Sequence, residues 1–281
     1  MSDRLKTEAK SPADKLRLNS LSGKLASAAF AVIPYASTLQ LKPSHFRIAA
    51  RLRLGLSPSA DMPTHCACPA VPPVLLSDNL LHLSHCKRFA PNFVIQRHNE
   101  VVDCIARAAR RVGASARVEP RKLRFAADDR RPDIDVYLGA DRFLVDASIR
   151  IPQPGDDALE ATRLASRKKH DRYDAQAKAV KATVIPFIVE TFGAWGDEAL
   201  RFAKTLKRHV AAQFGGDDDA AREFYYHFCS ELAVAVQRGN ARVFETALQA
   251  ARSSSDVELP CPRSVVQVPG SNSLVVHALV R

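Results

Sequence analysis

The sequence has no hydrophobic run long enough to span a membrane. Its longest apolar stretch, LASAAFAVIPYA at residues 25–36, is about half the length that a spanning helix needs. The first ten residues, MSDRLKTEAK, are charged and do not contain the apolar core of a secretory leader. The chain also has no internal repeat. These absences predict a soluble intracellular protein without a membrane-embedded part.

Acidic residues are fewer than basic ones, with 30 Asp and Glu against 41 Lys and Arg among 281 residues, so the net charge is +11. An excess of this size favours an acidic partner, chiefly nucleic acid, with an anionic membrane surface as the second option. Hydrophobic residues make up 46% of the chain and charged residues 25%, which is a globular composition with room for one or two cores. We therefore expect DNA as the partner, RNA as the next choice, and no membrane.

Cysteine is scarce, but three of the six cysteines lie within residues 66–86 and a histidine accompanies them. The four residues are Cys66, Cys68, His82 and Cys86. Because His82 and Cys86 are four positions apart, both project from one face of a helix. Three thiolates and one imidazole are a normal ligand set for a structural, tetrahedral zinc site. His65 and His85 are alternative fourth ligands, and a group of unliganded thiols is the other interpretation.

Apolar periodicity predicts an ordered series of helices and strands along the chain. Helices are expected at 45–55, 77–89, 97–113, 158–182, 198–214 and 220–237. Extended segments are expected at 116–125, at 130–150 as a hairpin, and at 183–193. This order predicts an α/β fold with a small mixed β-sheet flanked by helices, preceded by a small metal-binding module and followed by helices.

The segment RRPDIDVYLGADRFLVDASIR, residues 130–150, has the pattern of a tight β-hairpin with its turn at Gly139-Ala140. That turn pairs the apolar residues of one face, Ile134 with Val145 and Val136 with Phe143. On the other face, Asp133 and Asp146 become cross-strand neighbours with Cβ atoms about 5 Å apart. Like charges at this distance are destabilising unless a cation lies between them, and Mg²⁺ prefers such oxygen ligands. Alternatively, both acids decorate a solvated strand face.

The expected helix at 158–182 is dense in basic side chains: Arg163, Arg167, Lys168, Lys169, His170 and Arg172. Lys169 and Tyr173 are four positions apart and share a helical face. Such a helix could neutralise phosphates, and one lysine could stabilise the charge that develops on a reacting phosphate. A solvated helix surface is the alternative for most of these residues.

Taken in order, these motifs resemble the C-terminal region of non-LTR retrotransposon proteins that carry a restriction-like endonuclease. The resemblance extends from about residue 46 to about residue 196. It consists of the basic RLRLGL segment at 51–56, the zinc motif Cys66, Cys68, His82 and Cys86, the triplet Arg97-His98-Asn99, the acids Asp133 and Asp146, and the pair Lys169 and Tyr173.

The resemblance implies a PD-(D/E)XK nuclease fold in which two acids bind a catalytic Mg²⁺ close to a lysine. The implied catalytic residues are Asp133, Asp146, Lys169 and Tyr173, with Glu100 as a candidate third acid or, alternatively, an ordinary helix-surface glutamate. Nucleic-acid contacts are expected from Arg97, His98, Arg163, Arg167, Lys168 and Arg172. The zinc site is expected to be structural.

The sequence departs from the family pattern in two places. Ser148 stands where the general nuclease motif has a lysine, two residues after the second acid, and the resembling group places the lysine on the following helix, at Lys169. No YxDD-like reverse transcriptase motif is found, so we expect that the upstream reverse transcriptase domain is absent from this chain. The family also implies nuclear localisation.

Four regions are therefore predicted: 1–60 as the trailing edge of an upstream domain, 61–96 as the zinc module, 97–215 as the endonuclease core, and 216–281 as C-terminal helices with an irregular tail. The expected function is a Mg²⁺-dependent DNA endonuclease that nicks target DNA. The alternative is a catalytically inactive, zinc-containing remnant that binds nucleic acid. Both alternatives predict binding that weakens steeply as salt increases.

Overall fold

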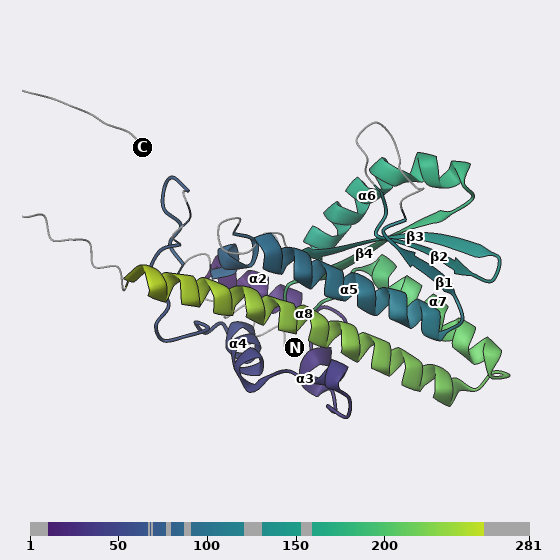
Figure 1. The fold of residues 1–281 in the computed structure, drawn as a ribbon, viewed down its shortest axis with the longest axis horizontal. Coiled ribbons are helices and arrows are strands. Elements are labelled where there is room, and N and C mark those ends of the chain that lie inside the picture. Colours follow the sequence, from purple (N-terminus) through teal and green to yellow (C-terminus); the bar gives the residue numbers. More distant parts are fainter. Residues whose placement is uncertain are drawn as a thin grey trace, which may run out of the picture.

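The computed structural model describes residues 11–66, 68, 70–76, 80–86, 91–120, 131–152 and 159–255. The helices are α2 (Pro12–Leu21), α3 (Ala28–Ala31), η1 (Ser37–Leu39), α4 (Pro43–Arg53), η2 (Leu80–His85), α5 (Pro91–Arg111), α6 (Glu160–Ala179), α7 (Asp197–Gln213) and α8 (Asp218–Ser255). The strands are β1 (Ser115–Val118), β2 (Ile134–Leu138), β3 (Asp141–Arg150) and β4 (Thr183–Glu190). Figure 1 shows their arrangement.

The sheet has the order β1-β2-β3-β4. The first three strands are antiparallel neighbours, whereas β3 and β4 are parallel and are joined through α6. Gly139 has a φ of 61° at the β2–β3 turn, a conformation that glycine adopts without a steric penalty. The predicted register of the hairpin is confirmed, since Ile134 pairs with Val145 and Val136 pairs with Phe143. The predicted α/β class with a mixed sheet is therefore confirmed.

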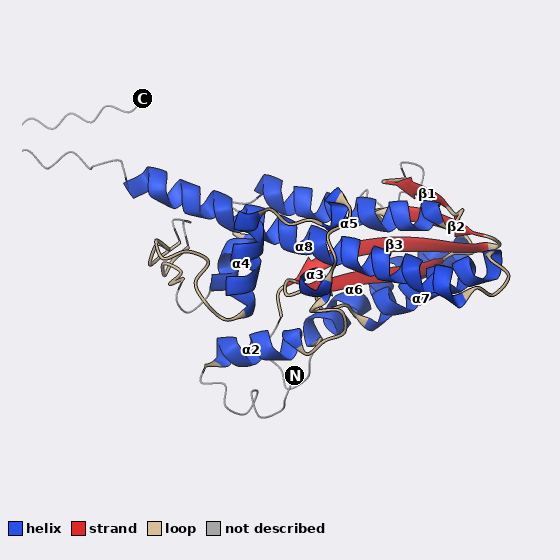
Figure 2. Ribbon diagram, turned by 90° about the horizontal axis from the view of Figure 1, so that it is seen from below, coloured by secondary structure: helices blue, strands red, loops and turns tan. Residues whose placement is uncertain are grey.

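Helices cover both faces of the sheet (Figure 2). One face carries Val136, Val145 and Phe187, and these pack in one apolar core against α5, α7 and α8. The opposite face packs against α6, where Leu144 and Val184 meet the inner side of that helix. Side chains alternate along a strand, so Asp135 in β2 and Asp146 in β3 lie on the face that packs against α6 and not on the face of the main core.

The long helix α8 runs beside α5 and continues beyond the sheet to α4 and the cysteine-rich region (Figure 1). The sequence predicts a helix only at 220–237, but α8 continues to Ser255. The helix continues through Gly239, where a Cβ atom would collide with the side chain of Arg97. Apolar residues of α8, such as Phe228 and Leu232, belong to the main core. The expected tail at 256–281 lies outside the described residues.

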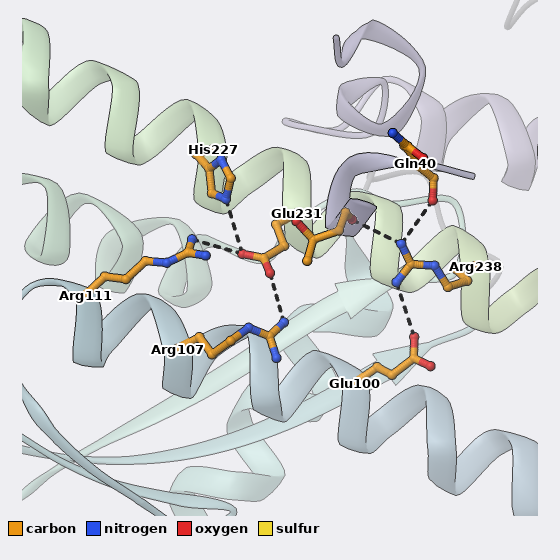
Figure 3. Close-up of polar contacts among 8 residues, drawn as sticks. Gln40, Glu100, Arg107, Arg111, His227, Glu231 and Arg238 are labelled. Atoms are coloured by element: carbon orange, nitrogen blue, oxygen red, sulfur yellow. Dashed lines mark hydrogen bonds and ion pairs between the residues drawn. The ribbon is translucent and has the colours of Figure 1, made fainter. Parts of the chain in front are cut away.

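Ion pairs fasten α5 to α8 (Figure 3). Glu231 of α8 is 2% exposed and accepts bonds from Arg107 at 2.9 Å and Arg111 at 3.2 Å, both on α5. Two turns of α8 further on, Arg238 donates to backbone carbonyls in the η1 region and lies 3.9 Å from Glu100. These contacts fix the orientation of α5 about its axis, which decides which of its polar side chains reach the sheet.

The N-terminal helices pack on α8, with α4 along its C-terminal half and α3 nearer its middle. The predicted basic helix at 45–55 is confirmed as α4, and Gly55 beyond its end has a positive φ of 75°. Within the described part of the chain, no helix is both long and apolar enough to cross a membrane. Residues 121–130, half of one segment expected to be extended, lie outside the described residues.

Candidate active site and metal centre

The cysteine-rich module is built from a short hairpin and a 3₁₀ helix. The amide of Cys66 donates to the carbonyl of Val74 at 2.9 Å, and the amide of Leu76 donates to that of Thr64 at 2.9 Å. These bonds bring the segment with Cys66 and Cys68 back toward η2. In place of the helix expected at 77–89, the described residues form only η2, while 77–79 and 87–89 lie outside them.

The four predicted ligands come together in the structure. Their donor atoms, from Cys66, Cys68, His82 and Cys86, all lie within 4.8 Å of one another. The Sγ atoms of Cys66 and Cys86 are 3.6 Å apart, and Cys68 Sγ is 3.4 Å from His82 Nε2. A disulfide would need about 2.05 Å, whereas zinc–ligand bonds of about 2.0–2.3 Å give tetrahedral edges of about 3.4–3.8 Å. The Cys₃His cluster could therefore hold a metal such as zinc.

The surroundings of the cluster agree with a structural role. Cys66 and Cys86 are buried in a small apolar cluster with Leu52 of α4 and Phe244 of α8. Burial raises the pKa of the Cys66 thiol to about 12, so this group becomes a thiolate near neutral pH only with a cation beside it. Of the alternative ligands, His65 is exposed and lies outside the cluster, and the side chain of His85 lies outside the described part.

The acidic centre lies where β2 begins and β3 passes it. Asp133 immediately precedes β2, and its Oδ2 accepts a bond of 2.7 Å from the backbone amide of Ala147 in β3. Asp146, in β3, is 7% exposed and turns toward α6. The imidazole of His98, near the start of α5, is 3.2 Å from Asp133 Oδ1. The two carboxyl groups are close enough to influence each other's pKa. Asp133 precedes the first paired residue of β2, so the predicted cross-strand pairing of Asp133 with Asp146 is not part of the strand register and stays a prediction.

Lys169 reaches this centre from α6. Its Nζ lies 2.6 Å from Oδ1 of Asp146, and its side chain is 9% exposed. Tyr173, one turn along the same inner face of α6, is buried and donates to the carbonyl of Arg131 at 3.4 Å. Ser148 occupies the position of the missing strand lysine, and Lys169 supplies an ammonium group beside the second acid instead.

The two carboxyl groups titrate differently because their neighbours differ. Burial raises the pKa of Asp146; the ammonium of Lys169 opposes this, and the negative charge of Asp133 adds to it. Burial alone would also raise the pKa of Asp133. The hydrogen bonds from His98 and from the amide of Ala147 outweigh burial, so the pKa of that carboxyl is lowered. The negative charge of Asp133 therefore works against ionisation of Asp146, and a cation between the two carboxylates would relieve that repulsion.

Two residues predicted for the site lie elsewhere. Arg97 is 2% exposed and donates to Oδ1 of Asn240 on α8 at 2.6 Å, so the prediction that it contacts nucleic acid is wrong for a guanidinium buried between helices. Glu100 turns toward α8, where Arg242 binds its carboxylate. Arg238 lies 3.9 Å from the same carboxylate (Figure 3). It is therefore not a third acid of the centre, because α5 directs it away from β2.

The other basic residues predicted on α6 lie outside the acidic centre. Arg167, Lys168 and Arg172 are exposed, and Arg163 is half-buried beside Glu160 at 2.8 Å. They remain accessible to a ligand, and their role in nucleic-acid binding stays a prediction.

The sequence did not reveal that His98 contacts the acidic centre. It was expected to contact nucleic acid, but its ring bonds to Asp133, and that bond raises the pKa of His98. No local pattern could have identified this contact, because it joins residues 35 positions apart and depends on how α5 crosses the sheet.

No family model matches this chain, and no curated protein matches it either. The functional argument therefore depends on the geometry of the two centres and on the motif series that the sequence contains.

Proposed function

We propose that this protein is a Mg²⁺-dependent DNA endonuclease with a PD-(D/E)XK core, in which the Cys₃His module binds a structural zinc ion. The observation that carries the proposal is the convergence of Asp133, Asp146 and Lys169, in which the lysine ammonium lies 2.6 Å from the second acid. The motif series resembles that of retrotransposon endonucleases, and a small mixed sheet that presents two acids is the core that this resemblance implies.

Asp133 and Asp146 would hold the metal, since oxygen ligands from carboxylates suit Mg²⁺. When bound, the ion would acidify an attacking water and shield the charge of the phosphate. Lys169 would orient Asp146 and place a positive charge where the pentavalent phosphate becomes more negative. His98 would orient Asp133, and its side chain, 33% exposed, is accessible enough to exchange a proton with water.

The choice of DNA as substrate rests on charge and on the family pattern. The chain carries a net charge of +11, and exposed cations of α6 lie within one turn of Lys169. Nuclear localisation is a further part of the proposal, and it follows from the resemblance alone.

A second candidate function is binding of nucleic acid without cleavage. The observation in its favour is that Lys169 already neutralises Asp146 in a nearly buried ion pair, which is also what a purely structural contact would look like. The two candidates differ in metal-dependent chemistry and agree in salt-sensitive binding.

Nicking of supercoiled plasmid tests the proposal. We expect the wild-type protein to nick in Mg²⁺ or Mn²⁺ and not in EDTA, and Asp133→Ala and Asp146→Ala to abolish nicking while DNA binding survives. Asp135→Asn is the matched control, because Asp135 is a buried acid on the same sheet face that pairs with Arg142 at 2.9 Å instead. Undiminished nicking by both alanine variants would remove the proposed site, and binding without nicking by the wild type would favour the second candidate.

A further inference from the structure

A groove lies along the β4 edge of the sheet, where α6 on one face meets the start of α7 on the other. Nε2 of His170 joins the two helices through bonds of 2.9 Å and 3.1 Å to the carboxylate of Glu198. Arg163, Ser166 and Arg167 line the groove from α6, and Arg201 lines it from α7. These α6 residues lie within two turns of Lys169, and the groove side of the helix begins at Ser166, about 60° round the axis from Lys169, and extends to Arg167, about 160° round it.

A second hollow continues the first along α7. Its lining includes Arg201, Lys204, Lys207, Arg208 and, from α8, Tyr225. Because Arg201 lines both hollows, they form one continuous surface, named here the α6–α7 groove. The apolar side of α7 is buried in the main core, so its basic residues are held on a rigid helix.

The α6–α7 groove is positively charged. Six cations line it, Arg163, Arg167, Arg201, Lys204, Lys207 and Arg208, and the acids among its described lining residues are Asp197 and Glu198. The side chains of Arg167 and Arg201 are 68% and 70% exposed, and their nearest carboxylate oxygens are 3.6 Å and 3.8 Å away. Ion pairs this exposed and this long are weak, so both guanidinium groups can exchange their partners for a phosphate.

We infer that the α6–α7 groove binds the phosphate backbone of duplex DNA beside the acidic centre. Guanidinium and ammonium groups together with hydroxyls, here those of Ser166 and Thr205, are the usual phosphate contacts of DNA-binding proteins. Among the described lining residues there is no exposed large aliphatic side chain that could insert into a membrane. The inference rests on the proposed function only in taking DNA as the ligand.

The test is binding of the full-length protein to a fluorescent DNA duplex in EDTA, measured by anisotropy over a range of salt concentrations. The groove variant is Arg201→Gln/Lys204→Gln/Arg208→Gln, which preserves much of each side-chain stem and the helix propensity. The control variant is Arg117→Gln/Lys178→Gln/Lys181→Gln, which removes the same charge from exposed positions. Arg117 lies on β1, at the opposite edge of the sheet, and Lys178 lies about 22 Å along α6 from Arg163.

We expect the groove variant to lose at least about tenfold in affinity at moderate salt, and its slope of log K against log salt to fall by about 2 to 3. The control variant should change affinity by less than about threefold, since charges far from the bound phosphates act only through a screened field. The inference is overturned when the groove variant and the control variant bind alike, or when the groove variant loses affinity for anionic vesicles but not for the duplex.

Circular dichroism and the melting temperature verify that both variants fold. Should the triple groove variant unfold, the double variant Lys204→Gln/Arg208→Gln gives the same comparison, with an expected slope change of about 1 to 2. Wild-type protein that binds through the groove but does not nick plasmid would remove the nuclease proposal and leave this inference standing. If the wild-type protein nicks plasmid but its groove variant binds DNA as tightly as the control variant, the groove inference falls and the nuclease proposal stands.

Discussion

The cysteine cluster and the acidic centre are two groups of potential metal ligands that are built in opposite ways. The cluster takes all four ligands from residues 66–86, which form one hairpin and one 3₁₀ helix. The acidic centre draws His98, Asp133, Asp146 and Lys169 from α5, the sheet and α6, and exists only when helices pack on both faces of the sheet. The cysteine cluster can form around a bound metal, whereas the acidic centre depends on the whole fold.

The two centres also differ in their charge before any metal binds. In the acidic centre, Lys169 and His98 already supply positive charge beside the carboxylates. In the cluster, three thiols and one imidazole surround one another, and burial keeps Cys66 protonated. The cysteine cluster would therefore need a bound cation to ionise its buried thiol, whereas the acidic centre has compensating side-chain cations without one.

The largest expected effect is the loss of zinc, because structural zinc sites contribute on the order of 10 kcal/mol to local folding. We expect wild-type protein to contain about one zinc per chain and Cys86→Ser to contain almost none. In hydrogen exchange, the variant should lose protection at residues 64–76 and 80–86 and keep it in β1 to β4. Cys104→Ser, a buried cysteine of the main core, is the control and should retain its zinc.

Loss of protection throughout the sheet of Cys86→Ser would show that the module is not locally built. A metal-free wild-type protein that is fully folded would contradict the zinc assignment itself.

Lys169→Met should reduce nicking by about 10²–10³-fold, a typical cost of removing one group that stabilises a developing charge. The substitution keeps the approximate length of the side chain and removes its positive charge. Lys169 does not belong to the cysteine cluster, so the zinc content should not change. Lys178→Met is the matched control, since Lys178 is an exposed lysine of the same helix, about 13 Å along α6 from Lys169, and is not a predicted nucleic-acid contact. Equal activity of the two variants would mean that the Lys169–Asp146 contact is only structural.

Arg97→Ala should lower the free energy of unfolding by about 2–3 kcal/mol, because it removes packing over Gly239 and leaves a buried amide oxygen of Asn240 without its donor. The salt dependence of DNA binding should stay that of the wild type. Urea denaturation and anisotropy measure the two quantities. Arg172→Ala, at an exposed position, should change stability by less than about 0.5 kcal/mol. A reduced salt slope in Arg97→Ala would restore the original prediction of a phosphate contact.

The smallest expected effect concerns His170, whose ring bonds to Asp174 and Glu198. Burial opposes protonation of this ring, but the two carboxylates outweigh it, so the pKa of His170 is raised. Its stabilising contribution is therefore complete below the ordinary histidine pKa of about 6.5 and is lost as pH increases through the higher folded value. His170→Gln should be less stable than wild type by a few tenths of a kcal/mol near pH 5.5 and nearly equal to it near pH 8.5. A difference that grows with pH would contradict this sign.

Several features of the fold and of both centres could be predicted because they follow from short-range periodicity. A strand alternates every two residues, so the turn at Gly139 predicted the pairing of Ile134 with Val145 and of Val136 with Phe143. A helix repeats every 3.6 residues, so Lys169 and Tyr173 had to share a face, and both are buried. The cysteine cluster was predictable from its local spacing, although the α-helix expected to carry His82 and Cys86 is a 3₁₀ helix that ends at His85.

The remaining errors concern polar residues of α5. Arg97, His98 and Glu100 are near neighbours in sequence, yet they bind Asn240, Asp133 and two arginines of α8, respectively. Which of them turns toward the sheet depends on how α8 packs on α5, and the contact between Arg97 and Asn240 joins positions 143 residues apart. No pattern within α5 contains that information. The same holds for Gly239 within α8, whose missing side chain makes room for the arginine of α5.

The central claim is that Asp133 and Asp146 share one divalent cation. Diffraction from crystals soaked in Mn²⁺, recorded near the manganese absorption edge, tests this most directly. The account predicts one anomalous peak in contact with both carboxylates in the wild-type protein, and no peak there in Asp146→Ala. Wild-type crystals with no peak between the two acids at saturating Mn²⁺, or with a peak that persists in Asp146→Ala, would contradict it.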